Sequence, residues 1–112
     1  MIEAYSFGKM TLDGKVYSSD LIIYPERIDH SWWRRSGHSL CVKDIQQALD
    51  AKPEVLIIGT GYMGLMKVTD EVKETVDNNR IELIIQKSQK AVKSYNEMAV
   101  KKKTIGAFHL TC

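Results

Sequence analysis

Three glycines in residues 59–64 have the G-x-G-x-x-G spacing that is typical of dinucleotide-binding turns. The segment follows an apolar run at residues 55–58, which is expected to be a buried strand, and it precedes a predicted helix. Backbone amides in such a turn, at Gly59, Thr60 and Gly61, can hold a small anion. The same glycines could instead serve only to allow a tight turn under close packing. Both interpretations stay open at this point.

Three features of the neighbouring sequence argue against a dinucleotide at this turn. The next helix is expected to begin near Asp70 rather than at Gly64, so its positive end would not meet a pyrophosphate. The following strand ends with Ile85-Gln86-Lys87, without the acidic residue that binds a ribose. A chain of 112 residues is also too short for a second mononucleotide-binding half. We therefore expect no cofactor.

A second group of residues that could bind a ligand consists of Trp32, Trp33, Arg34 and Arg35, followed by Gly37 and His38. An arginine offers a planar set of donors for carboxylate or phosphate, and an indole ring offers a stacking surface. These residues predict a small-ligand or partner site. Aromatic and basic residues side by side also occur in nucleic-acid-binding proteins, but one short cluster on a nearly neutral chain does not favour that role. Alternatively, Arg34 only pairs with a surface acid such as Glu26.

The pairs His38/Cys41 and His109/Cys112 share one spacing, and together they could supply two imidazoles and two thiolates to zinc. In a tight loop, side chains three positions apart can converge on a metal, whereas on a strand they diverge because side chains alternate. His109 is predicted to lie on a strand, so we expect no metal site. Nucleophilic catalysis by a Cys–His pair is not favoured either, because no third orienting group is identifiable.

The composition is that of one domain with an ordinary charge balance. The chain has 112 residues, with 16 Lys and Arg against 14 Asp and Glu, and a formal net charge of +2. This length suits a single domain spanning residues 1–112. The small net charge gives no general attraction to nucleic acid or anionic lipid. No apolar run approaches the roughly 20 residues of a membrane span, and two cysteines without an export signal predict free thiols and a cytoplasmic location.

Apolar periodicity and turn signals predict a β-rich first third, followed by alternating helices and strands. Asp13-Gly14 predicts a hairpin turn between residues 10–12 and 15–17. Further strands are expected at residues 21–24, 28–34, 55–58, 81–86 and 105–110, and helices at residues 42–51, 70–79 and 88–101, the last two capped by Thr69 and Ser88. This order predicts an α/β domain of three layers, with helices on both faces of a mixed central sheet and an additional N-terminal β portion.

Four stretches of the chain occur in an order that is shared with a known family. They are Trp33-Arg34…His38-Ser39, Ile57-Ile58-Gly59-Thr60-Gly61, Ala91-Val92…Tyr95-Asn96 and Gly106…Phe108-His109…Thr111-Cys112. In these stretches the chain resembles the adipogenesis-associated-protein domain family over nearly its whole length. The resemblance implies a three-layer α/β domain and carries no established reaction. A mitochondrial assembly factor for respiratory complex I is more distantly similar, at Gly59-Thr60-Gly61 and Asn96. Cys41 and Gly64 lie outside the family pattern, which weighs against the zinc and dinucleotide sites.

Together these observations predict a binding site formed by eight residues: Trp33, Arg34, His38, Gly59, Thr60, Gly61, Asn96 and His109. We favour a binding module that holds a small anion or a protein partner near residues 59–61. The segment 87–103, with six lysines and one acid, could add a basic face for a negative partner or remain simply solvated. The alternative is an enzyme that acts on a small acidic metabolite through Arg34 and His38. The enzyme would need its polar groups to converge in one concave pocket, whereas an interaction module would leave them scattered beside exposed apolar surface.

Overall fold

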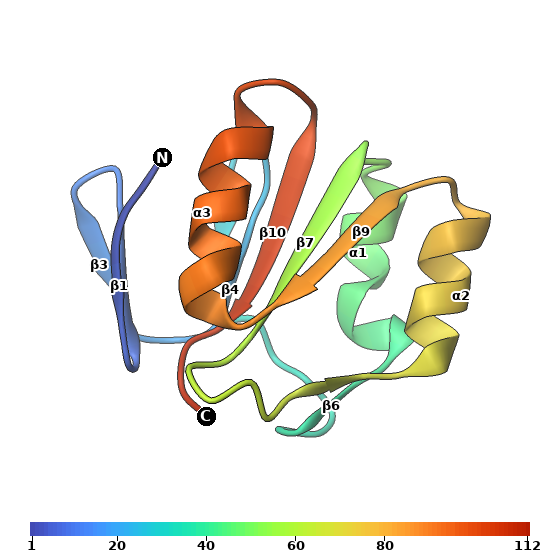
Figure 1. Ribbon diagram of the computed structural model, residues 1–112, viewed down its shortest axis with the longest axis horizontal. Coiled ribbons are helices and arrows are strands. Elements are labelled where there is room, and N and C mark those ends of the chain that lie inside the picture. Colours follow the sequence, from blue (N-terminus) through green and yellow to red (C-terminus); the bar gives the residue numbers. More distant parts are fainter.

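A five-stranded mixed sheet forms the middle layer of the computed structural model, which describes residues 1–112 (Figure 1). Its strands, in spatial order, are β5 (Ile28–Asp29), β4 (Leu21–Ile23), β10 (Thr104–His109), β7 (Val55–Thr60) and β9 (Glu82–Gln86). β10 runs parallel to β7 and antiparallel to β4, and β7 is parallel to β9. Every residue of β7 is buried, because the strand has neighbours on both edges and cover on both faces. The predicted mixed sheet and the interior position of residues 55–58 are therefore confirmed.

The remaining elements form the two outer layers. One face of the sheet carries the 3₁₀ helix η1 (Val42–Ile45), α1 (Gln46–Asp50) and α2 (Asp70–Asn78). The other face carries α3 (Ser88–Ala99) and an antiparallel sheet of β1 (Ile2–Ser6), β2 (Lys9–Leu12) and β3 (Lys15–Tyr17). Figure 1 shows α3 in front of β4 and next to β10, with the N-terminal strands on the other side of the helix. This is the predicted three-layer α/β fold with its additional N-terminal β portion.

Alternation along the strands divides the apolar side chains between two cores. In β7, Leu56 and Ile58 pack toward α1 and α2, whereas Val55 and Ile57 pack toward α3 and the N-terminal strands. None of the helices has the length and apolar character that a membrane span requires.

Local signals placed the turns and the second helix correctly. Asp13 and Gly14 both have positive φ, as a two-residue hairpin turn between β2 and β3 requires. Thr69 caps α2, since its hydroxyl oxygen accepts from the backbone N–H of Val72 at 3.4 Å. The same hydroxyl donates to the carbonyl of Leu40 at 2.9 Å, which ties α2 to the two-stranded sheet of β6 (Ser39–Leu40) and β8 (Lys67–Val68). Strands of two residues carry no periodicity, so this small sheet was not predicted.

Two local predictions are wrong. The strand expected at residues 28–34 ends at Asp29, because the Asp29 carboxylate accepts from the N–H of Ser31 and turns the chain toward Asp20. Ser88 is not the cap of α3; that position is Lys87, and Ser88 is the first helical residue. The Ser88 hydroxyl is used instead in the core, where it contacts β10 and the loop after β7.

Candidate functional site

The side chains of Asp20, Arg34 and His109 meet at the carboxyl end of β10. Asp20 directly precedes β4, Arg34 lies in the loop after β5, and His109 is the last residue of β10. The antiparallel pairing of β10 with β4 brings Asp20 next to His109. On the other side of β10, His109 is paired with Thr60 of β7. Two of the predicted site residues, Arg34 and His109, are thus brought together near a third, Thr60.

The carboxylate of Asp20 accepts hydrogen bonds from three neighbours. Its Oδ2 lies 2.6 Å from Nη1 of Arg34 and 2.7 Å from Nδ1 of His109, and its Oδ1 accepts from the backbone N–H of Leu110 at 2.7 Å. Nδ1 of His109 also lies 3.1 Å from Nη2 of Arg34. A guanidinium can only donate and an ionised carboxylate can only accept, so the short contact to Asp20 assigns the imidazole proton to Nδ1.

This cluster is largely withdrawn from solvent. The relative exposure of the side chain is 6% for Arg34, 9% for His109 and 17% for Asp20. The guanidinium carbon of Arg34 lies 4.7 Å from the ring centre of Trp32, which belongs to the core. Nε of Arg34 is buried without a hydrogen-bond partner. Arg34 is therefore committed to Asp20 and Trp32, and it does not form the surface pair with Glu26 that the sequence left open.

The hydrogen bonds decide the protonation state of Asp20. Burial raises the pKa of this carboxyl group, but the hydrogen bonds from His109, from the Leu110 amide and from Arg34 act in the opposite direction. Their combined effect holds the pKa of Asp20 below its ordinary value, so the group remains ionised at neutral pH.

The lowered pKa predicts that Asp20 contributes stability that acid removes. A carboxyl group of this kind stabilises the fold above its unfolded pKa of about 3.9, and the contribution is lost as the pH falls through the lower pKa of the folded state. We expect the difference in free energy of unfolding between the wild type and Asp20→Asn to be constant from about pH 7 to 5 and to shrink below about pH 4. Urea titrations across this range measure the difference. A value that stays constant to about pH 3 would contradict the assignment.

The Asp20–His109 pair has the carboxylate–imidazole arrangement that orients a general base in hydrolases. The surroundings do not complete such a site. The Ser88 hydroxyl donates to the carbonyl oxygen of His109 at 2.6 Å and not to its imidazole. Neither of the two clefts on the molecule has Asp20, Arg34 or His109 in its lining. The cluster therefore joins β4, β10 and the loop after β5 without facing a pocket.

The glycine-rich turn after β7 is occupied by the C-terminal residues of the chain. The backbone N–H groups of Tyr62 and Leu65 donate to the carbonyls of Thr111 at 2.7 Å and Cys112 at 3.0 Å, and that of Gly61 donates to Ser88 Oγ at 3.0 Å. Gly61 has φ +107°, and a Cβ there would lie 2.5 Å from the backbone of Cys112. An anion at this turn would have to compete with the chain's own carbonyl oxygens for these amides.

The glycine at the end of β7 makes room for an aromatic ring. A Cβ at Gly59 would lie 2.8 Å from Cδ1 of Phe108 and 2.8 Å from Oγ of Ser88. Gly106 of β10 also makes room for this ring, because a Cβ there would lie 2.5 Å from Cε2 of Phe108. Both glycines therefore allow close packing around Phe108.

The other predicted site residues do not join the cluster. The side chain of Trp33 is 77% exposed, and His38 is also exposed and makes no side-chain hydrogen bond. Asn96 lies on α3, where its amide accepts from the backbone N–H of Ile2 and donates to the backbone carbonyl of the same residue, at 2.9 and 2.8 Å. The side-chain amide of Asn96 thus bonds the backbone of Ile2 in the way that a neighbouring strand would. The polar atoms of Asn96 therefore have a structural role.

The structure shows where the two His/Cys pairs of equal spacing lie, for which no metal site was expected. Nδ1 of His109 is held by Asp20, and the Cys41 thiol lies 3.3 Å from the carboxylate of Asp44. Cys112 is exposed, and both cysteines are free. The structure contains no group of three or more His, Cys, Asp or Glu side chains arranged to hold a metal ion.

Sequence reasoning missed Asp20 and the character of the loop after Gly61. Asp20 stands alone before an apolar strand, and only its pairing with residues 14 and 89 positions away gives it a role. The loop contains Tyr62, Met63 and Leu65, whose side chains are all exposed. Three apolar residues in one glycine-rich loop could have indicated exposed apolar surface, because a short loop does not bury its own side chains.

Comparison with known proteins is consistent with this fold. Residues 2–110 match a family described as "Protein of unknown function (DUF498/DUF598)". The conserved hypothetical protein PH1505 from Pyrococcus horikoshii OT3 is 30% identical, with a TM-score of 0.86 over 100% of this chain and 99% of that one. The structure of MT938 is 24% identical, with a TM-score of 0.82 over 100% and 98% of the two chains. A Bordetella pertussis protein, described as an Mth938-like domain, is 20% identical, with a TM-score of 0.75 over 97% and 84%. The last two similarities concern the fold alone.

Proposed function

Since the chain belongs to the DUF498/DUF598 family of proteins of unknown function, we propose its function from its geometry, as a protein-binding module. Its contact surface is centred on the loop between β7 and β8. The observation that carries this proposal is a group of exposed apolar side chains, which we call the apolar rim: Phe7 (53% exposed), Tyr62 (41%), Met63 (59%) and Leu65 (51%). Large apolar side chains that gather at one exposed place mark interaction sites on soluble proteins.

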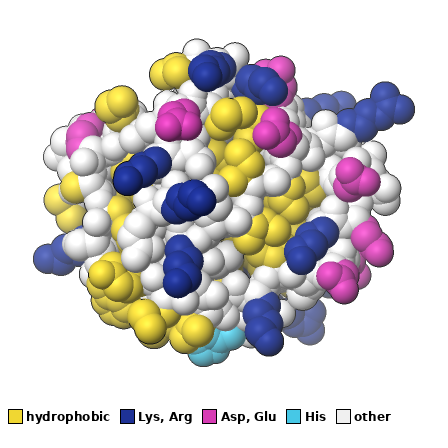
Figure 2. Space-filling view, viewed as in Figure 1, with side chains coloured by type: hydrophobic (Ala, Val, Ile, Leu, Met, Phe, Trp, Pro, Cys, Tyr) yellow, Lys and Arg dark blue, Asp and Glu magenta, His cyan; other side chains and the backbone are white.

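The members of the apolar rim come from two parts of the chain that lie side by side. The ring of Phe7, in the turn between β1 and β2, lies 5.9 Å from the ring of Tyr62 in an edge-on arrangement. Tyr5 of β1 is also near, with ring centres 6.4 Å apart. Figure 2 shows hydrophobic side chains gathered along the lower edge of the molecule, where Figure 1 places this turn and this loop.

The loop that carries Tyr62, Met63 and Leu65 is tied to the rest of the fold by hydrogen bonds. Its amides are bonded to Ser88 and to the C-terminal carbonyls, as described above, and the carbonyl of Tyr62 accepts from the side-chain amide of Gln89 at 3.3 Å. The backbone at Gly61 and Gly64 has positive φ, which glycine adopts at low cost. A loop that is already ordered loses less conformational entropy on binding, so its exposed side chains can serve as anchors.

Basic side chains next to the apolar rim indicate the chemistry of the partner. The side chain of Lys87 packs against Gly64, where a Cβ would lie 3.0 Å from its Cγ. Lys90 and Lys93 are exposed on the first turns of α3, and Figure 2 shows a row of basic side chains over this helix. We therefore propose that the partner presents apolar side chains flanked by carboxylates.

The distribution of polar groups supports a binding module over an enzyme. Arg34 is buried against Asp20, His38 is exposed elsewhere, and no cleft collects the predicted polar residues. The resemblance to the adipogenesis-associated-protein domain family, and through it to an assembly factor, supports the same proposal, because assembly factors act by binding proteins. The free thiols of Cys41 and Cys112 support a cytoplasmic location for this binding.

Site-specific photo-crosslinking in cells tests the proposal. A photoreactive phenylalanine analogue is placed at Met63 in one variant and, in another, at Val100, which is 79% exposed and directly follows the end of α3. We expect the analogue at position 63 to crosslink one discrete protein. The analogue at position 100 should not crosslink that protein. Met63→Ser together with Leu65→Ser should weaken binding of the identified partner at least about tenfold, because anchors of this kind dominate interface energies.

The matched control is Val16→Ser with Val100→Ser, which removes two apolar side chains of similar exposure outside the apolar rim. This pair should leave the affinity unchanged. Equal loss of binding in the two double variants, or the same crosslinks from both positions, would refute the apolar rim as the contact surface.

A further inference from the structure

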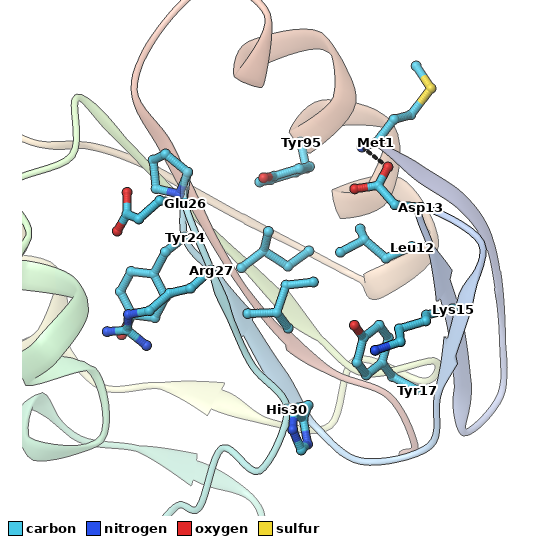
Figure 3. A pocket seen from close by; sticks show the side chains of 13 residues that line it. Met1, Leu12, Asp13, Lys15, Tyr17, Tyr24, Glu26, Arg27, His30 and Tyr95 are labelled. Carbon is cyan, nitrogen blue, oxygen red and sulfur yellow. Dashed lines mark hydrogen bonds and ion pairs between the residues drawn. The ribbon is translucent and has the colours of Figure 1, made fainter.

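The largest cleft of the molecule, with a volume of about 480 Å³, does not gather its charged groups around one position (Figure 3). The guanidinium of Arg27 lies over the ring of Tyr24, 3.9 Å from its centre. Figure 3 shows both of these side chains turned away from Tyr95 and Tyr17. The carboxylate of Asp13 is held by the N-terminal amine at 3.1 Å. Unsatisfied hydrogen-bonding groups that face one direction are found instead at the edge of the five-stranded sheet.

The outer side of β9 is an edge of this sheet, because β9 is the last strand in the spatial order and pairs only with β7. The backbone N–H of Glu82 donates to the carbonyl of Glu54 at 3.0 Å, so the peptide groups of Glu82 face β7. Peptide groups of successive residues in a strand point to opposite edges, so those of Leu83 and Ile85 face outward. No other group of the protein is bonded to them. The N–H and C=O groups of both residues are therefore free to pair with a further strand.

This edge lacks the features by which proteins commonly protect an edge strand from further pairing. Its register with β7 runs without a bulge, and the strand contains neither proline nor lysine. Its three central residues are apolar: Leu83 and Ile84 are half-buried, and Ile85 is 37% exposed. Figure 1 shows no strand beyond β9, and Figure 2 shows an apolar area in the same place, right of the centre. The edge is therefore suited to take up an extended segment of another chain.

The charges beside this edge are positive and unpaired. Arg80 precedes β9 and Lys87 follows it, while Lys73 and Lys90 are exposed on α2 and α3. None of these side chains has a carboxylate within ion-pair distance, whereas Glu82, the one acid of the strand, already belongs to an ion pair. Figure 2 shows basic side chains on both sides of the apolar area, with the acids over α2 farther out. These charges favour an acidic segment and disfavour a second copy of this chain, which would bring the same cations together.

We propose that β9 takes up an extended acidic segment of another protein as an additional, antiparallel strand of the sheet. The centre of this pairing is the residue opposite Ile84, and its two neighbours exchange hydrogen bonds with Leu83 and Ile85. Apolar side chains at these three positions cover the exposed part of the edge, and carboxylates beyond them face Lys87 at one end and Arg80 at the other. This surface does not include the apolar rim, so each of the two proposals can fail without the other.

Titration of the ¹⁵N-labelled protein with the capped peptide acetyl-Glu-Glu-Val-Val-Val-Thr-Glu-amide tests the proposal. In the antiparallel pairing the threonine lies opposite Glu82, so that no two carboxylates oppose each other. We expect saturable binding with a dissociation constant below about 1 mM and amide shifts centred on β9. Near saturation, hydrogen exchange of the Leu83 and Ile85 amides should slow at least about fivefold, whereas the amide of Ile84, which faces β7, should not change.

Two N-methylated forms of the peptide separate strand pairing from charge attraction. A methyl group on the nitrogen of the third residue removes a donor that faces β9, and it should weaken binding at least about tenfold. The same group on the fourth residue lies on the far edge of the added strand and should change the affinity by less than about threefold. The neutral peptide with glutamine in place of each glutamate should bind at least about fivefold more weakly than the acidic one.

Substitutions in the protein provide the matching comparison. Lys73→Gln together with Lys90→Gln should weaken binding of the acidic peptide at least about fivefold. The control variant Lys15→Gln with Lys43→Gln removes the same charge from exposed positions elsewhere and should leave the affinity unchanged.

The proposal is overturned by equal binding of the two N-methylated peptides, by equal binding of the acidic and neutral peptides, or by equal weakening in the two double variants. Shifts centred on residues 62–65 or on the cleft beside Tyr95, or no saturable binding, overturn it as well. Concentration-dependent dimerisation that shifts the β9 amides in the absence of peptide would identify a second copy of the chain as the occupant and would also refute the proposal.

Discussion

Asp20→Asn is expected to lower the free energy of unfolding by about 3–5 kcal/mol. The substitution keeps the shape of the side chain but removes the negative charge that Arg34 and His109 share. Arg34 is then left as a buried charge whose Nε already lacks a partner. Urea unfolding of the purified protein measures the change. A loss below about 1 kcal/mol would show that the cluster behaves as an ordinary surface pair.

Two comparisons separate this effect from a general sensitivity of the fold. Glu82→Gln removes the acid of the half-exposed pair with Lys102 and should cost less than about 1 kcal/mol. Adding Arg34→Met to Asp20→Asn removes the orphaned charge, so the double variant should be more stable than Asp20→Asn alone. A double variant that is less stable than the single one would contradict the account of Arg34 as an uncompensated buried charge.

Phe108→Ala is expected to cost about 3–5 kcal/mol, the usual result of emptying the site of a fully buried aromatic ring. The ring of Phe108 lies edge-on to Tyr95, with centres 6.0 Å apart and planes at 77°, and it fills the space over Gly59 and Gly106. Differential scanning calorimetry or urea unfolding measures the loss. A cost below about 1 kcal/mol would mean that the ring is not the centre of this core.

The stability cost of replacing Gly106 by alanine should depend on whether the ring of Phe108 is present. Gly106→Ala alone is expected to cost about 1–3 kcal/mol, because the new Cβ overlaps Phe108 and Tyr95. In the Phe108→Ala background the same Cβ enters an empty space, so the added cost should fall to near zero or change sign. Gly37→Ala, where a Cβ meets nothing within 4 Å, is the neutral control. Additive costs for Gly106→Ala and Phe108→Ala would rule out the packing role of this glycine.

The two predictions above concern the same end of the sheet, and together they describe its construction. Asp20 joins the start of β4 to the end of β10, and the C-terminal residues join the end of β10 to the loop after β7. A partner that binds the apolar rim would therefore contact a loop that the C-terminal residues hold in place. The position of those residues depends in turn on the bond between Asp20 and Leu110. Asp20→Asn should be kept out of binding assays for this reason, whereas the serine substitutions in the apolar rim leave these contacts in place.

The sequence by itself determined those elements whose structure depends on interactions between residues close together in the chain. The Asp13-Gly14 turn, the Thr69 cap and the apolar run at residues 55–58 each act within a few residues of the chain, so their patterns predicted a hairpin, a helix start and a buried strand. From these elements the three-layer architecture followed, because a buried strand needs cover on both faces. The two errors, the length of β5 and the cap at Ser88, arose where a side chain bonds locally or in the core instead of continuing the expected element.

Tertiary structure alone decided what the chemistry-bearing residues do. A glycine pattern is the same whether the space beside it holds a phosphate, an aromatic ring or the chain's own C-terminus, and here Phe108 and Cys112 take that space. Arg34 could have faced solvent, but Asp20 and His109, 14 and 75 positions away, draw it into the interior. The exposure of Met63 and Leu65 and the cleft beside Tyr95 likewise depend on which segments meet in space. Such contacts join residues far apart in the sequence, and no periodicity or spacing records them.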